Sequence, residues 1–277
     1  MQPILNKAPI GLFDSGVGGL SVLRAIRPTL PYENILYFGD QAHVPYGRRA
    51  KQELIQFSTA IVNYLIKHGA KLIVIACNTA SAAALHALRE QYPEFPIVGM
   101  EPAVKPAVQK SESDIVGVLA TPSTFESDLF SSIVERFAQD TTLLTSTCIG
   151  LVPEIEAGRA NGLEARRILT EALVPMLEQG LDSLVLGCTH YAFAEKTITE
   201  IVGPDVAIID PAPAIAQRIE SLLTAGELLN PDRLPGQIRY MTSGDPGEMQ
   251  TRVRELIGGE ADVEGIRWQG LELGPEG

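Results

Sequence analysis

The 277-residue sequence has few cysteines and no long apolar runs, and each shortage excludes a class of protein. Its three cysteines are odd in number and form no Cys-x-x-Cys pair, which argues against a metal finger or a disulfide framework and favours a reducing compartment. No apolar run approaches the roughly 18 residues of a membrane span, and the short polar N-terminus lacks the apolar core of a signal peptide. We therefore expect a cytoplasmic protein with no membrane partner.

Basic residues are also scarce, because 22 Lys and Arg stand against 34 Asp and Glu and give a formal charge of -12. An acidic protein is not attracted to nucleic acid, so we expect no nucleic-acid partner. A small anionic substrate is still compatible with this net charge, because hydrogen-bond donors within the binding site decide whether it binds. With 45% hydrophobic and 20% charged residues, the chain has an ordinary globular composition and a length that favours one or two domains.

What the sequence does contain is a series of short apolar runs that alternate with helical patterns. This alternation predicts an α/β fold with mostly parallel, doubly wound sheets. The pattern loosens over residues 101–110 and then restarts with a strand at 115–120, a helix at 124–137 and a further helix at 193–202. We predict two lobes, the first formed by residues 1–100 plus 211–277 and the second by residues 101–210.

Two cysteines follow buried strands in the same way. The apolar run 72–76 leads into Cys77 and a helix, and the run 183–187 leads into Cys188 and polar residues able to cap a helix. Ligands of open α/β sheets bind at the carboxyl ends of strands, and a helix N-terminus favours a reactive thiolate. The alternative is that each cysteine is a small buried residue. The repetition favours two thiols facing one cleft between the lobes.

Two facing thiols suit the inversion of a carbon stereocentre without a cofactor. One thiolate removes a proton from carbon, while the other thiol delivers a proton to the opposite face. The developing carbanion needs hydrogen-bond donors around the substrate carboxylate, and Asn78, Thr79 and Thr189 are placed to supply them.

Each thiol also has a candidate tuning partner. Asp14, at the end of the first strand, can exchange a proton beside Cys77, and its charge favours the thiol form. His190, two residues beyond Cys188, can stabilise a thiolate or relay a proton; capping a helix is its alternative role. We expect an unequal pair in which Cys188 ionises more readily.

A glycine-rich turn follows the first strand and leaves two interpretations open. Gly16-x-Gly18-x-x-Ser21 approximates a dinucleotide fingerprint, but Asp14 at the strand end would repel phosphate. The other interpretation is that Asp14 and Ser15 face the cleft, while the glycines allow a tight turn.

Taken together, these pieces resemble the cofactor-independent glutamate racemases of bacterial cell-wall synthesis. Each motif is short, but five of them occur in the family's order. They are Phe13-Asp14-Ser15-Gly16-Val17-Gly18-Gly19, Pro45-Tyr46-Gly47-x-Arg49, Ala76-Cys77-Asn78-Thr79-Ala80, Val152-Pro153-x-x-Glu156 and Gly187-Cys188-Thr189-His190-Tyr191.

The resemblance implies two pseudo-symmetric lobes that interconvert L- and D-glutamate in the cleft between them, supplying D-glutamate for peptidoglycan. It implies that Cys77 acts on the D-enantiomer and Cys188 on the L-enantiomer. Asp14, Glu156 and His190 would assist the thiols. The residues implied to line the substrate are Asp14, Ser15, Tyr46, Gly47, Asn78, Thr79, Thr189 and His190. No metal, pyridoxal phosphate or other cofactor is implied; the expected partner is glutamate, with a homodimer left open.

The sequence departs from the family's pattern outside the reacting groups. Ala192 stands where Pro is usual and Ser123 where Gly is common, and Ile149-Gly150 follows Cys148 where many members have Pro. Cys148 lies outside both thiol motifs, so we predict a structural role for it.

Three alternatives stay open. A racemase of the same superfamily can act on aspartate, although the Pro45-Tyr46-Gly47 loop, which the family uses for the distal carboxylate, favours glutamate. A two-lobed binding protein would need neither thiol, and a cysteine hydrolase would need one.

Overall fold

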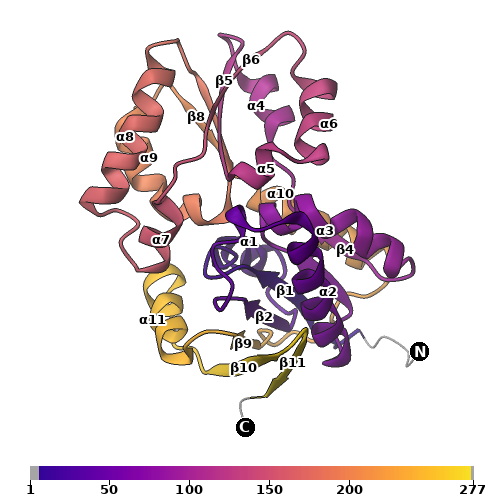
Figure 1. Ribbon diagram of the computed structural model, residues 1–277. Coiled ribbons are helices and arrows are strands. Elements are labelled where there is room, and N and C mark those ends of the chain that lie inside the picture. Colours follow the sequence, from indigo (N-terminus) through magenta and orange to yellow (C-terminus); the bar gives the residue numbers. More distant parts are fainter. Residues whose placement is uncertain (1–5, 276–277) are drawn as a thin grey trace.

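The computed structural model describes residues 6–275 and arranges them around two sheets, one above the other in Figure 1. The larger sheet has the strand order β11-β10-β9-β2-β1-β3-β4, and its neighbours are parallel except for the antiparallel pair β10 and β11. Its strands are β1 (Ile10–Asp14), β2 (Ile35–Gly39), β3 (Leu72–Ile75), β4 (Ile97–Gly99), β9 (Ile238–Thr242), β10 (Val263–Gln269) and β11 (Glu272–Pro275).

The smaller sheet has the order β6-β5-β7-β8 and is parallel throughout. Its strands are β5 (Ile115–Ala120), β6 (Thr142–Ser146), β7 (Ser183–Gly187) and β8 (Ala207–Ile209). The predicted α/β fold with mostly parallel sheets is confirmed.

Helices cover both faces of the larger sheet because its central strands are apolar on both sides. Successive side chains of a strand point to opposite faces, so Leu72 and Val74 join one hydrophobic core while Ile73 and Ile75 join another. The first core is closed by α1 (Leu20–Thr29) and α10 (Ala212–Ala225), and the second by α2 (Lys51–Lys67) and α3 (Asn78–Gln91).

The remaining helices complete the two layers. Helix α11 (Pro246–Ile257) packs beside β9 and β10. The helices around the smaller sheet are α4 (Val104–Lys110), α5 (Pro122–Phe125), α6 (Asp128–Phe137), α7 (Leu151–Glu156), α8 (Leu163–Leu177) and α9 (Glu195–Val202). No helix in the described range 6–275 is both long and apolar enough to cross a bilayer.

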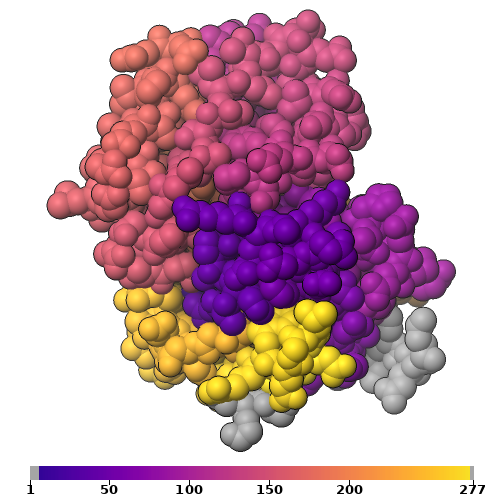
Figure 2. All heavy atoms as spheres, in the orientation of Figure 1, coloured from indigo at the N-terminus to yellow at the C-terminus, as the bar shows by residue number. Residues whose placement is uncertain are grey.

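The C-terminal segment returns to the first part of the chain. Strand β9 pairs with β2 along its whole length, from Ile238 beside Ile35 to Thr242 beside Gly39. Figure 1 and Figure 2 show this yellow segment against the indigo N-terminal strands and helices. The larger sheet thus combines residues 10–99 with residues 238–275, while the smaller sheet uses residues 115–209.

Local hydrogen bonds change two predicted helices. The helix predicted over 124–137 is broken into α5 and α6, because Ser127 is extended and its Oγ accepts a bond from Phe130 N at 3.1 Å. The helix predicted over 193–202 begins with a 3-10 helix, Thr189–Ala194, and turns α-helical at Glu195. Helix α4 and strand β11 were not predicted.

Candidate active site

Cys77 lies two residues after the apolar strand β3 and caps helix α3. Its Sγ accepts a hydrogen bond from Ala80 N at 3.4 Å and donates one to Ser15 Oγ at 3.8 Å. The thiol is 6% exposed. Burial raises its pKa, and the negative charge of Asp14 raises it further. The resting state of this residue is therefore the thiol.

Cys188 ends β7 and lies beside a buried ion pair. Its Sγ is 3.9 Å from Nδ1 of His190, whose Nε2 is 2.6 Å from Oε1 of Glu156 at the end of α7. Burial opposes the charged imidazolium, but hydrogen bonds and charges of Cys188 and Glu156 outweigh it and raise the His190 pKa well above its usual value. Burial likewise opposes a charged Glu156, but the bond from His190 leads the contacts that hold its pKa low.

Both thiols line one cavity of about 230 Å³. A cavity of this volume suits a ligand the size of an amino acid better than a larger one. Cys77 follows a strand of the larger sheet and Cys188 follows a strand of the smaller sheet, so the cavity lies between the two sheets. The predicted site residues in its wall are Ser15, Tyr46, Gly47, Cys77, Asn78, Thr79, Cys188 and His190.

The amide of Asn78 marks a binding position in this wall. The residue is 2% exposed, and neither its Nδ2 nor its Oδ1 has a hydrogen-bond partner within the described chain. A buried amide left unpaired costs roughly 1–3 kcal/mol. A ligand that offers both an acceptor and a donor removes this cost.

Three predicted site residues lie behind the wall instead of in it. Asp14 is fully buried; its Oδ2 accepts from Gly16 N at 2.9 Å and its Oδ1 from Thr189 Oγ1 at 3.2 Å. Glu156 Oε1 accepts from Val17 N at 2.8 Å. The predicted contacts of Asp14 and Thr189 with substrate stay predictions.

The glycine-rich turn serves the close approach of the assisting groups. A Cβ at Gly16 would overlap the Glu156 carboxylate, and one at Gly18 would overlap the His190 ring. The N–H groups of Gly16 and Val17 already donate to protein carboxylates. Those donors are not free for a phosphate, which argues against the dinucleotide interpretation of the turn. Ser15 lines the cavity as the other interpretation expects, whereas Asp14 lies behind it.

The comparison with known sequences agrees with this geometry. The profile described as Asp/Glu/Hydantoin racemase matches residues 19–219, which is well over half of the chain. The chain belongs to this racemase family.

Individual glutamate racemases match the chain over most of its length. A glutamate racemase of Pseudomonas paraeruginosa is 46% identical over 258 residues, covering 93% of this chain and 97% of its own. The structure of glutamate racemase from Thermus thermophilus has a TM-score of 0.80 at 37% identity and covers 95% of this chain and 98% of its own. The structure of glutamate racemase from Francisella tularensis, in complex with D-glutamate, has a TM-score of 0.82 at 30% identity. It covers 95% of this chain and 98% of its own.

The structure adds wall residues that were not predicted to line the site. Thr121 follows β5 and its Oγ1 lies 2.8 Å from Thr79 Oγ1, which joins the two sheets across the cavity. The strand-end rule that found the cysteines would have found Thr121 as well. Cys148 also lines the cavity, in left-handed backbone at φ 42°, and burial raises its pKa to about 11. The other added residues are Pro45, Arg48, Pro122, Thr147, Ile149, Gly150, Val152, Pro153 and Tyr191.

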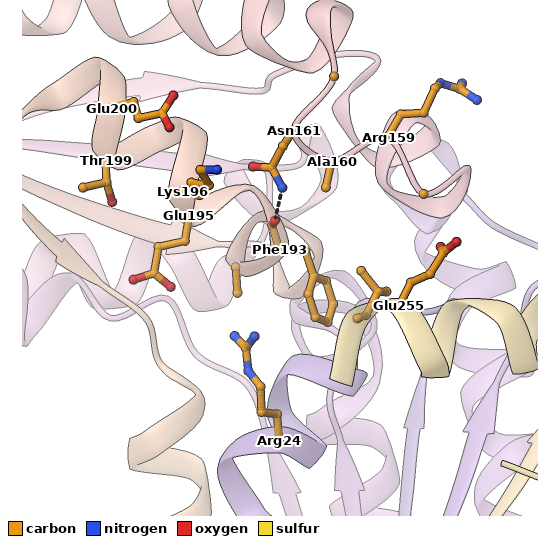
Figure 3. A pocket seen from close by; sticks show the side chains of 14 residues that line it. Arg24, Arg159, Ala160, Asn161, Phe193, Glu195, Lys196, Thr199, Glu200 and Glu255 are labelled. Atoms are coloured by element: carbon orange, nitrogen blue, oxygen red, sulfur yellow. Dashed lines mark hydrogen bonds between the residues drawn. The ribbon is translucent and has the colours of Figure 1, made fainter. Parts of the chain in front are cut away.

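A second, larger hollow of about 920 Å³ lies between α1, α9 and α11 (Figure 3). Arg24 stands over the Phe193 ring at 5.5 Å, and Asn161 donates to the Phe193 carbonyl at 3.5 Å. Its charged side chains are exposed and neither thiol reaches it, so we place the chemistry in the smaller cavity. Across residues 6–275, no group of three or more His, Cys, Asp or Glu is placed to hold a metal ion.

Proposed function

We propose that this family member interconverts L- and D-glutamate, with Cys77 and Cys188 as its two acid/base residues. The observation that carries the proposal is that thiols from two separate sheets line one amino-acid-sized cavity. The match to glutamate racemases over most of the chain supports glutamate as the substrate. The D-glutamate complex of the Francisella tularensis relative supports the same ligand. The D-glutamate that the reaction forms is supplied for peptidoglycan synthesis.

The reaction moves one proton off the α-carbon and another onto it. With L-glutamate bound, the Cys188 thiolate takes the α-proton, and the electron pair of the broken C–H bond spreads into the α-carboxylate. The Cys77 thiol then gives its proton to the opposite face and forms the new C–H bond. Cys188 ends as the thiol and Cys77 as the thiolate, which is the arrangement that the reverse reaction requires.

The ion pair beside Cys188 prepares this starting state. A protonated His190, held by Glu156, attracts a thiolate at Cys188. Asp14 and burial keep Cys77 as the proton-bearing thiol. These surroundings support the proposal of an unequal pair.

Donors in the wall stabilise the carbanion. The α-proton of an amino acid is far less acidic than a thiol. Hydrogen-bond donors that are already in place must therefore stabilise the negative charge that develops on the carboxylate. The N-terminal turn of α3, with the Asn78 amide, provides such donors. In this mechanism Asn78 supplies hydrogen bonds and transfers no proton.

Single Ser variants of the two cysteines test the proposal. We expect Cys77→Ser and Cys188→Ser each to abolish change in the optical rotation of L- and D-glutamate solutions, because each direction needs both thiols. A cysteine hydrolase would lose activity with one variant alone, and a binding protein would never racemise. Racemisation of aspartate but not glutamate by the wild type would favour the aspartate alternative.

We infer two further properties from the same arrangement. The three free thiols suit a reducing cytoplasm, where cell-wall precursors are made. The second is the lobe division of residues 1–100 plus 211–277 against residues 101–210. The separate membership of the strands in two sheets supports it, and limited proteolysis near residues 101 and 211 tests it.

A further inference from the structure

Asp40 is a buried carboxylate that the proposed chemistry leaves unused. It follows β2, is 0% exposed and does not line the cavity. Its Oδ2 accepts from the hydroxyl of Tyr46 at 2.6 Å and lies 2.9 Å from Nδ1 of His43. Asp40 therefore holds a residue of the cavity wall from behind.

The other oxygen of Asp40 reaches the C-terminal segment. Its Oδ1 accepts from Ser243 Oγ at 2.6 Å and from Trp268 Nε1, in β10, at 2.7 Å. A carboxylate has about four acceptor positions, and here all four are filled. No described residue after Tyr191 lines the cavity. Asp40 connects the C-terminal strands to Tyr46 by hydrogen bonds, beside the ring contacts of Phe57 with Trp268 and Tyr46.

Packed rings fix the directions of these donors. The His43 ring stacks on Phe57 with 3.9 Å between centroids, and the Trp268 ring lies 4.9 Å from His43 and 5.4 Å from Phe57. Trp268 is the single tryptophan of the sequence. Its indole thus reports on the hydrogen bond to Asp40.

We propose that Asp40 is a positioning residue that sets Tyr46 against the substrate and that Trp268 anchors it from the C-terminal strands. The inference rests on the proposed glutamate racemisation. Because Asp40 is outside the cavity wall and Tyr46 inside it, loss of the carboxylate weakens binding of both enantiomers more than it slows proton transfer.

Asp40→Asn tests this role at nearly constant volume, since Asn replaces one acceptor oxygen by a donor. We expect KM for L- and D-glutamate to rise about tenfold and kcat to fall less than about threefold, in line with the loss of a charge-assisted hydrogen bond. Tyr46→Phe shifts KM in the same direction, and the double variant is no worse than the more impaired single one. Asp182→Asn removes a carboxylate that accepts hydrogen bonds from residues 111–113, between α4 and β5, and keeps the wild-type KM.

Tryptophan fluorescence gives the second measurement. We expect glutamate to change the Trp268 emission with a midpoint that follows KM in the wild type, and this change to need about tenfold more glutamate in Asp40→Asn. Should that variant not fold, Trp268→Phe keeps an aromatic ring, removes one donor and raises KM about threefold.

The outcomes separate this inference from the function on which it rests. If Asp40→Asn lowers the Tm but leaves KM and the fluorescence titration unchanged, Asp40 has a structural role and the inference is overturned. If Asp40→Asn fails to fold, an unchanged KM in Trp268→Phe overturns it. A wild type that racemises no glutamate would overturn the proposed function instead.

Discussion

At the scale of single residues, the site depends on side chains that reach across the cleft into space left by glycine. His190 lies where a Cβ of Gly18 would be, and Glu156 where that of Gly16 would be. The sequence alone allowed either a phosphate turn or a tight turn here, because the partner is more than a hundred residues away. Only the folded contact distinguishes the two.

Gly18→Ala tests this close approach. The added methyl group displaces the His190 ring, and we expect kcat to fall about a hundredfold, the cost of an ångström-scale misplacement. Gly247→Ala is the control, because its Cβ would meet only one atom, Asp245 Oδ1, at 3.2 Å and lies far from both thiols in the sequence. Steady-state racemisation rates compare them, and equal rates would refute the proposed approach.

The Glu156–His190 pair predicts a pH window of stability. The depressed Glu156 pKa adds stability above the usual carboxyl pKa, about 4.3, which is lost as pH falls through the folded value. The raised His190 pKa adds stability below about 6.5, which is lost as pH rises through its high folded value.

We therefore expect Glu156→Gln to cost about 2 kcal/mol of unfolding free energy near neutral pH, as for a charge-assisted hydrogen bond. The cost shrinks in acid and in strong base. Urea denaturation across the pH range measures it, and a cost that is constant with pH would contradict the ion pair.

At the scale of elements, the sequence predicts the bounds of a helix or strand best where several local patterns in one stretch agree. The apolar face of α2 and the glycine that closes it, Gly69, lie within one short stretch of sequence, so the pattern alone predicts a helix over 51–67, which is the observed Lys51–Lys67. The break at Ser127 was missed because a cap and an interior serine look alike within an amphipathic pattern. The Asp40 cluster was missed because two of its four donors, Ser243 and Trp268, are over 200 residues away in the chain.

A buried ion pair holds several of these elements together. Lys71 Nζ, just before β3, lies 2.6 Å from Glu33 Oε2 and donates to the carbonyl oxygen of Leu228 at 2.7 Å. Glu33 Oε1 accepts from Asn230 N at 2.7 Å. The pair thus ties the larger sheet to the chain that leads back into β9.

Lys71→Met leaves the Glu33 carboxylate buried without its partner. We expect a loss of about 3–5 kcal/mol of unfolding free energy in urea denaturation. Lys7→Met breaks the exposed pair with Asp232 and costs much less, because solvent screens it. Equal losses in the two variants would show that burial of Lys71 has no energetic weight.

At the scale of the whole molecule, the sequence predicted the α/β class and both strand-end thiols, because each strand and its following residue are adjacent in the chain. It did not predict which further residues complete the cavity wall, such as Thr121 and Tyr191, since the packing of one sheet against the other decides that. The homodimer stays a prediction, and light scattering of the purified chain measures its mass.

The central claim is that one α-carbon lies between thiols of the two sheets, each facing a different side. Racemisation of unlabelled L-glutamate in heavy water, sampled early, tests it most directly. The account predicts that the D-glutamate formed carries deuterium at the α-carbon while the remaining L-glutamate does not, because different thiols remove and deliver the proton. D-glutamate that keeps its original proton, or L-glutamate that exchanges without inversion, would contradict it.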